Sequence, residues 1–206
     1  MQLRPSLTAV VQEAPEAAAL LLLAGGRSRR MGQPKALLRV GEVSLVEWLA
    51  ARLAPGFDQL LVSVAEAVQL PSALRPHGVL DLHAGAGPLA GIEAGLAASR
   101  QPVLVAVACD MPYVSPELLL RLRQAALGHD AAVPLAAGRP EPVCAAYRLS
   151  AAGAVAASLG AGERRAAAPL GDLDVAWLQD VDAGQLRSLN TPADYSAFLD
   201  ALRYWG

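Results

Sequence analysis

The apolar run AALLLLA, Ala18–Ala24, leads directly into the loop GGRSRRMGQPK, Gly25–Lys35. An uninterrupted apolar run that stops at glycine is typical of a strand buried on both faces of a sheet. The two leading glycines allow a tight turn that aims backbone N–H groups at an anion, and the three arginines and the lysine add positive charge. This stretch predicts the first strand of an α/β sheet followed by a phosphate-binding loop.

The loop differs from a P-loop, in which lysine follows the second glycine immediately and is itself followed by Ser or Thr. Here Lys35 comes three residues after Gly32 and precedes Ala36. A solvated basic turn remains the alternative interpretation of the same composition, and other positions of the chain must distinguish the two.

Composition narrows the class of protein. With 206 residues and a formal charge of −2, the chain has the size of one domain and lacks the basic surface of a nucleic-acid binder. The apolar run 17–24 is far too short for the roughly 20 residues of a membrane span. Cys109 and Cys144 lack CxxC spacing and suit buried thiols in a reducing cytosol. We expect a cytoplasmic protein with a flexible tail over 1–16 and one domain over 17–206.

Apolar runs alternate with stretches of helical period along the rest of the chain, which indicates a sheet covered by helices. Strands are expected at 18–24, 59–64, 78–82, 102–108, 131–134, 143–149 and 175–178. Helices are expected at 44–53, at 89–99, from 115 onward, after 150 and at 191–202. The fold class is therefore α/β, a single Rossmann-like three-layer domain with a mostly parallel sheet, whose ligand crevice lies at the carboxyl ends of the strands.

Two aspartates are expected at that crevice, Asp81 and Asp110. Asp110 ends the most hydrophobic strand, where a carboxylate has no packing purpose and suits a Mg2+ ligand. Helix capping is the alternative role, but Ser115 is a nearer cap for the following helix. Mg2+ keeps waters and substrate phosphate oxygens among its ligands, so one or two aspartates suffice.

The string L-A-G-G-x-S-x-R-M-G-x-x-K, from Leu23 to Lys35, resembles the signature of nucleotidyltransferases with a GT-A-like α/β fold. Further segments match in the same order along the chain: Gly87–Ile92, Cys109–Pro112, Glu141–Val143, Gly162–Arg165 and Asn190–Pro192. Together they are similar to the molybdenum cofactor guanylyltransferases, the molybdopterin-guanine dinucleotide biosynthesis protein A family. The resemblance covers nearly all of the chain beyond the predicted tail.

The resemblance implies a role for each matching residue. It places these residues in catalysis: Lys35, Arg29, Arg30 and Asp110, with Asp110 also holding Mg2+. It places these residues at the nucleotide: Leu23, Ala24, Gly25, Gly26, Lys35, Ser63, Asp81 and Asp110. It places these residues at the acceptor: Glu141, Arg164, Arg165 and Asn190. Ser63 departs from the asparagine that the resembled enzymes often carry, which leaves its contact with the nucleotide open.

Asp81 is a candidate for base selection, because a carboxylate can accept the N1–H and N2–H of guanine together and cytosine offers different donors. The implied reaction transfers GMP from GTP to the terminal phosphate of molybdopterin, with or without molybdenum, and releases pyrophosphate. The implied partners are GTP, the cofactor and, transiently, cofactor-inserting proteins or molybdoenzymes. A cytidylyltransferase of the same cofactor, a sugar-1-phosphate nucleotidyltransferase and a non-catalytic nucleotide-binding carrier remain alternatives.

Overall fold

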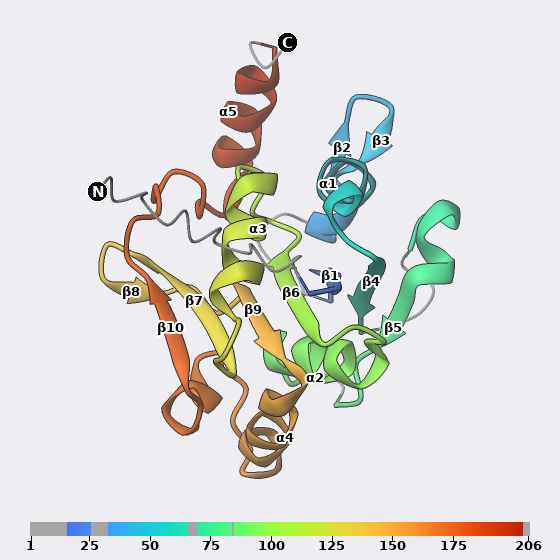
Figure 1. The fold of residues 1–206 in the computed structure, drawn as a ribbon. Coiled ribbons are helices and arrows are strands. Elements are labelled where there is room, and N and C mark those ends of the chain that lie inside the picture. The colour runs from blue at the N-terminus through green and yellow to red at the C-terminus, as the bar shows by residue number, and fades with distance from the viewer. Residues whose placement is uncertain (1–15, 26–32, 66–69, 84, 204–206) are drawn as a thin grey trace, which may run out of the picture.

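The computed structural model describes residues 16–25, 33–65, 70–83 and 85–203, and in this part eight strands form one sheet while two short strands form a separate hairpin (Figure 1). The strands of its main path, in spatial order, are β10 (Val175–Leu178), β7 (Ala131–Ala136), β9 (Cys144–Arg148), β6 (Val103–Ala108), β1 (Ala18–Leu23), β4 (Gln59–Val64) and β5 (Gly78–Leu80). A short strand, β8 (Arg139–Pro140), pairs with β7. The expected first strand is therefore central in the sheet.

Most pairs on the main path are parallel, as predicted. The strands β6, β1, β4 and β5 form a parallel block, and β10 runs parallel to β7. The exception is β9, which runs antiparallel to both β6 and β7. Because β9 inserts between them, β7 and β10 still point the same way as β1, and their starts share one edge of the sheet.

Helices cover both faces of the sheet, which gives the expected three layers (Figure 1). One face carries α1 (Leu45–Leu53), α3 (Pro116–Ala125) and α5 (Pro192–Leu202), and the other carries α2 (Pro88–Ala98) and α4 (Ala152–Gly160). The side chains of β1 alternate between the two cores: Leu20 and Leu22 lie in the first, Leu21 and Leu23 in the second. Within the described residues, no helix is long and apolar enough to cross a membrane.

Local signals placed the helix starts correctly. Ser44 and Thr191 form capping boxes, and the Ser115 hydroxyl accepts from the N–H of Leu118. Each cap satisfies a backbone donor that the first helical turn leaves without a partner. The boundaries of α1, α3 and α5 are therefore those that the capping residues predict.

The expected strand 78–82 is shorter in the structure, where β5 ends at Leu80, which pairs with Val64, the last residue of β4. The sequence did not predict the hairpin of β2 (Arg39–Val40) and β3 (Val43–Ser44), which turns at Gly41 with a φ of 59°. It also did not predict the short 3-10 helices η1 (Lys35–Leu37), η2 (Ala54–Gly56), η4 (Ser72–His77), η5 (Leu149–Ala151) and η6 (Ala168–Asp172). Residues 1–15 of the predicted tail lie outside the described part of the chain.

Candidate active site

The ends of β1, β4 and β5 bring three predicted nucleotide-binding residues together. Beyond the strands, the Ala24 N–H donates to the Ser63 carbonyl at 2.9 Å, and the Asp81 N–H donates to the Val64 carbonyl at 3.0 Å. The Ser63 hydroxyl then donates to Asp81 Oδ1 at 2.7 Å. Ser63, which departs from the family pattern, therefore has a defined role here, because it holds the Asp81 carboxylate in place.

Gly25 lies directly opposite the other oxygen of Asp81. A Cβ added at Gly25 would lie 2.9 Å from Asp81 Oδ2 and 3.3 Å from the backbone nitrogen of Ala65, so a larger residue would close this space. Burial raises the pKa of Asp81, while the hydrogen bond from Ser63 acts in the opposite direction. The arrangement presents a partly desolvated carboxylate close to the Gly25 backbone, and such a carboxylate suits a ligand edge that carries N–H donors.

Gly91 of α2 lies beneath this pair. A Cβ at Gly91 would be 2.4 Å from Ser63 Oγ and 2.8 Å from Leu23 Cδ2, so the helix rests against the ends of β1 and β4. Ser63 is 1% exposed as a result. The segment Gly87–Ile92 was part of the family resemblance, but the need for glycine at position 91 follows only from this contact.

A second cluster lies at the end of β6. The Lys35 ammonium donates to Asp110 Oδ2 at 2.8 Å and to Asn190 Oδ1 at 2.9 Å, and the Lys35 and Asp110 side chains are 18% and 22% exposed. The Leu189 N–H donates to the Asp110 carbonyl at 2.7 Å, and the Asp194 carboxylate accepts the Asn190 N–H at 3.0 Å. The start of α5 is thus attached to the end of β6, with Lys35 between their side chains.

Glu141 belongs to the same cluster. Its backbone N–H donates to the Pro134 carbonyl, which holds the segment between β8 and β9 against β7. Burial raises the pKa of Glu141, and the negative charge of Asp110 raises it further. The structure therefore brings two of the predicted acceptor-binding residues to this end of the sheet, Asn190 in contact with Lys35 and Glu141 near Asp110.

The other two predicted acceptor residues lie elsewhere. Arg164 packs against the loop before α2, where a Cβ at Gly87 would be 3.1 Å from its carbonyl oxygen. It also borders a hollow of about 430 Å3 that His83 and Ala86 share. Arg165 is exposed and pairs with Glu163 at 3.4 Å. The predicted acceptor set is therefore divided between the end of β6 and the loop before α2.

Three predicted site residues, Gly26, Arg29 and Arg30, lie outside the described part of the chain. Leu23 and Ala24 are buried at the end of β1, so only their backbone groups are available to a ligand. The Cys109 N–H donates to the Leu23 carbonyl at 3.1 Å, which holds the residue before Asp110 against the end of β1.

The oxygens around Lys35 fit a cation. Asp110 supplies a carboxylate and Asn190 an amide carbonyl, which are hard oxygen donors of the type that Mg2+ prefers. In the described part of the chain, no group of three or more His, Cys, Asp or Glu side chains could hold a metal by itself. A magnesium ion at this position would therefore depend on substrate oxygens and water for its remaining ligands.

The two cysteines are free and buried. Burial and the nearby charge of Asp110 raise the pKa of Cys109 to about 12, and burial also raises the pKa of Cys144. Both thiols are therefore protonated near neutral pH, whereas a nucleophilic cysteine needs the thiolate. The burial of both cysteines agrees with the sequence-based expectation of buried thiols.

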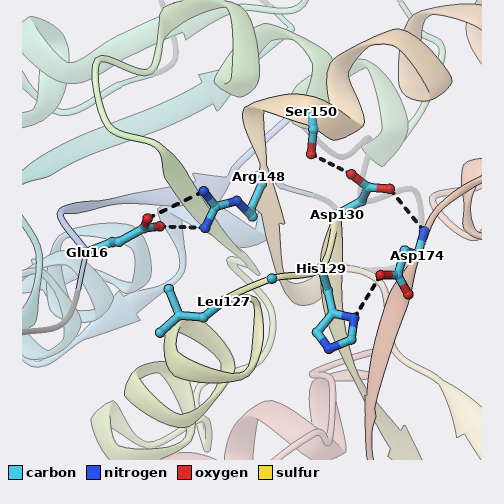
Figure 2. A pocket seen from close by; sticks show the side chains of 8 residues that line it. Glu16, Leu127, His129, Asp130, Arg148, Ser150 and Asp174 are labelled. Atoms are coloured by element: carbon cyan, nitrogen blue, oxygen red, sulfur yellow. Dashed lines mark hydrogen bonds and ion pairs between the residues drawn. The ribbon is translucent and has the colours of Figure 1, made fainter. Parts of the chain in front are cut away.

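Figure 2 shows another hollow, of about 500 Å3, at the opposite edge of the sheet, where β7 and β10 begin. Arg148 at the end of β9 pairs there with Glu16, which precedes β1, at 2.5 Å. Other lining groups also pair: His129 contacts Asp174 at 3.0 Å, and Ser150 donates to Asp130 at 2.5 Å. These contacts connect strand ends, and none of the predicted site residues that the structure describes lines the hollow.

A largely parallel sheet with carboxylates just beyond its strand ends, one of them paired with a lysine, is typical of the α/β nucleotidyltransferases. The chain matches the model of the MobA-like NTP transferase domain over residues 20–191, and it belongs to that family. The predicted GT-A-like fold and the predicted enzyme class are confirmed.

Relatives and solved structures agree with this assignment. The chain is 41% identical to a "Probable molybdenum cofactor guanylyltransferase" of Pelotomaculum thermopropionicum, over 68% of this chain and 67% of the relative. A relative of the same name from Natronomonas pharaonis is 39% identical, over 84% of this chain and 93% of its own length. The crystal structure of molybdopterin-guanine dinucleotide biosynthesis protein A from Archaeoglobus fulgidus is similar with a TM-score of 0.78 and 28% identity, covering 90% and 99% of the two chains.

Proposed function

We propose that this nucleotidyltransferase moves GMP from GTP to the terminal phosphate of molybdopterin, with or without molybdenum, and releases pyrophosphate. The observation that carries the proposal is the meeting of Lys35 and Asp110 at 2.8 Å just beyond the carboxyl end of β6, next to the end of β1. This pair supplies one cation and one carboxylate where a triphosphate bound to loop 25–35 would lie. The names of the relatives support the choice of GTP and molybdopterin.

The chemistry needs no general base from the protein. A phosphate monoester has a second pKa of about 6, so the attacking phosphate is already a dianion near neutral pH. The residues must hold two phosphates in line and neutralise their charge, which is the main task in phosphoryl-type transfer. In this proposal, Lys35, Arg29 and Arg30 contact the phosphates, and Asp110 holds Mg2+, which would neutralise charge on the reacting group.

Base selection is assigned to Asp81. Its Oδ2 faces Gly25, while Ser63 donates to Oδ1, so the carboxylate is held in one orientation. A carboxylate has about four acceptor positions, so the bond from Ser63 leaves room for the N1–H and N2–H of guanine. Leu23, Ala24, Gly25 and Gly26 would contribute backbone groups to the same nucleotide.

The acceptor is assigned to the remaining predicted residues: Glu141, Arg164, Arg165 and Asn190. The arginines would meet the phosphate of the pterin from the side of the loop before α2. A cytoplasmic location and transient contact with cofactor-inserting proteins or molybdoenzymes complete the proposal, and the free, buried thiols are compatible with a reducing compartment.

The test supplies the purified protein with molybdopterin, Mg2+ and GTP, CTP, ATP or UTP in turn, and follows pyrophosphate. We expect pyrophosphate release to be fastest with GTP, and we expect Asp110→Asn to lose most of this release. The matched control is Asp172→Asn at the end of η6, which is exposed and precedes β10 at the far edge of the sheet.

The other outcomes separate the alternatives. Release with CTP in place of GTP would make the chain a cytidylyltransferase. Tight GTP binding without release would favour a carrier, and no release with any of the four would contradict the proposal. Asp81→Ala should reduce the preference for GTP over CTP, and an unchanged preference would remove Asp81 from base selection.

A further inference from the structure

The position of Lys35 resembles that of a bound metal ion. Its ammonium lies between two oxygens from separate elements, Asp110 Oδ2 at 2.8 Å and Asn190 Oδ1 at 2.9 Å. Glu141 adds a second carboxylate close enough for the charge of Asp110 to affect its pKa. The two oxygens that hold the ammonium therefore come from the segment after β6 and from the start of α5.

Lys35 is also the only lysine among the 206 residues, and every other one of the 17 Lys and Arg residues is arginine. The two side chains differ in shape, because ammonium is a compact point charge and guanidinium is a broad planar fork. Only the compact charge can sit between two oxygens in the manner of a small cation. The one lysine of the chain lies where that difference matters.

We infer that the Lys35 ammonium holds the cation position between Asp110 and Asn190 while no nucleotide is bound, and leaves it to the divalent ion when phosphates draw the ammonium away. This inference rests on the proposed function, because it assumes that a triphosphate binds beside Lys35. It gives Asn190 a role at the cation position before any acceptor arrives. The metal and the nucleotide would then enter together, since a metal alone would have to displace the lysine.

The first test measures binding of Mn2+, as a probe, to the nucleotide-free protein by electron paramagnetic resonance. If the lysine fills the position about 90% of the time, the apparent affinity for a metal is lowered about tenfold. We therefore expect Lys35→Met to bind Mn2+ about tenfold more tightly than the wild type. Adding Asn190→Ala should remove most of that gain, and adding Asp110→Asn should remove all of it.

The matched control is Arg100→Met, which removes the same charge from an exposed residue just before β6. The six residues of β6 separate it from Asp110 by about 20 Å. We expect Arg100→Met to bind Mn2+ as the wild type does. Equal affinities in the wild type and Lys35→Met, or an equal gain in Arg100→Met, would overturn the inference.

The second test follows the lysine directly. Labelling with 13Cε-lysine gives one side-chain resonance from the untagged protein, because the chain has one lysine. We expect millimolar Mg2+ alone to leave this resonance in place, and Mg2+ with the α,β-methylene analogue of GTP to move it. A shift produced fully by Mg2+ alone, or no shift with both, would contradict the exchange.

The proposed reaction and the exchange of cations can be disproved separately. If no nucleotide supports pyrophosphate release but the Mn2+ affinities and the lysine resonance behave as expected, the proposed reaction is wrong and the exchange of cations stands. If release with GTP is normal and Lys35→Met gains no affinity for Mn2+, the reaction stands and the exchange is wrong.

Discussion

Replacement of Gly91 by alanine should damage nucleotide binding out of proportion to its effect on stability. The new Cβ would lie 2.4 Å from Ser63 Oγ, at least 0.6 Å inside the 3.0 Å that real Cβ contacts respect. Ser63 Oγ is close to its own backbone and also donates to Asp81 at 2.7 Å, so it cannot move without changing that hydrogen bond. Gly91→Ala must therefore displace either α2 or the carboxylate that is assigned to guanine.

Gly95→Ala is the matched control one helical turn further along α2. Its Cβ would meet Leu21 Cδ2 at 2.5 Å and Leu104 Cδ2 at 3.0 Å, which are the far ends of flexible core side chains. Overpacking of this kind costs about 1–3 kcal/mol, and the better helix propensity of alanine returns about 1 kcal/mol. The free energy of unfolding of both variants should therefore fall by roughly 1 kcal/mol, which corresponds to a fall in Tm of about 2–4 °C.

Their affinities for GTP should differ. A hydrogen bond to a charged group contributes about 1.5–3 kcal/mol, and 1.4 kcal/mol is a factor of ten in affinity. We expect Gly91→Ala to bind GTP at least about tenfold more weakly and Gly95→Ala to bind within about twofold of the wild type, both by isothermal titration calorimetry, with urea unfolding for stability. Normal GTP affinity in Gly91→Ala, or an equal loss in Gly95→Ala, would refute the reasoning.

Three further predictions concern charges. Burial raises the pKa of Asp81 above its ordinary 3.8, so the folded protein loses stability as the pH rises from 3.8 through the raised pKa. Asp81→Asn should remove this loss when urea unfolding is measured at several pH values. An unchanged pH profile would argue against a desolvated carboxylate. Glu141→Gln should raise the free energy of unfolding at pH 7, because it removes a buried charge and its repulsion from Asp110. The gain should be smaller when Asp110→Asn is already present, and equal gains would mean that the two carboxylates do not interact. Arg148→Met removes the partly exposed ion pair with Glu16 and should lower the free energy of unfolding by about 1 kcal/mol or less, measured by thermal unfolding. The affinity for GTP should stay normal, and a fall in that affinity would connect the hollow of Figure 2 to the active site.

Much of the architecture follows from local sequence signals. The apolar runs predicted β4 and β10 with the bounds that the structure has, and the capping residues Ser44, Ser115 and Thr191 predicted three helix starts. These predictions succeed because burial of a strand and satisfaction of a helix terminus depend on residues that are neighbours in the chain. The hairpin of β2 and β3 was missed because its strands have two residues each, too few to show a period.

The candidate site also has a part that the sequence predicts and a part that only the fold decides. The sequence by itself determined that a glycine turn, a lysine and two strand-end aspartates would gather at one edge of the sheet, because parallel strands end at the same edge. Only the tertiary structure decided which groups meet. The contact between Lys35 and Asn190 joins residues 155 positions apart, and the one between Ser63 and Asp81 joins two strands.

The need for glycine at position 91 has the same origin, since it depends on how closely α2 packs on β1 and β4. No local pattern encodes such distances, because they result from the packing of whole elements against each other. The loop that begins at Gly25 therefore predicts a phosphate ligand from its residues alone. The partners of its lysine, Asp110 and Asn190, became known only when β6 and the start of α5 were placed beside it.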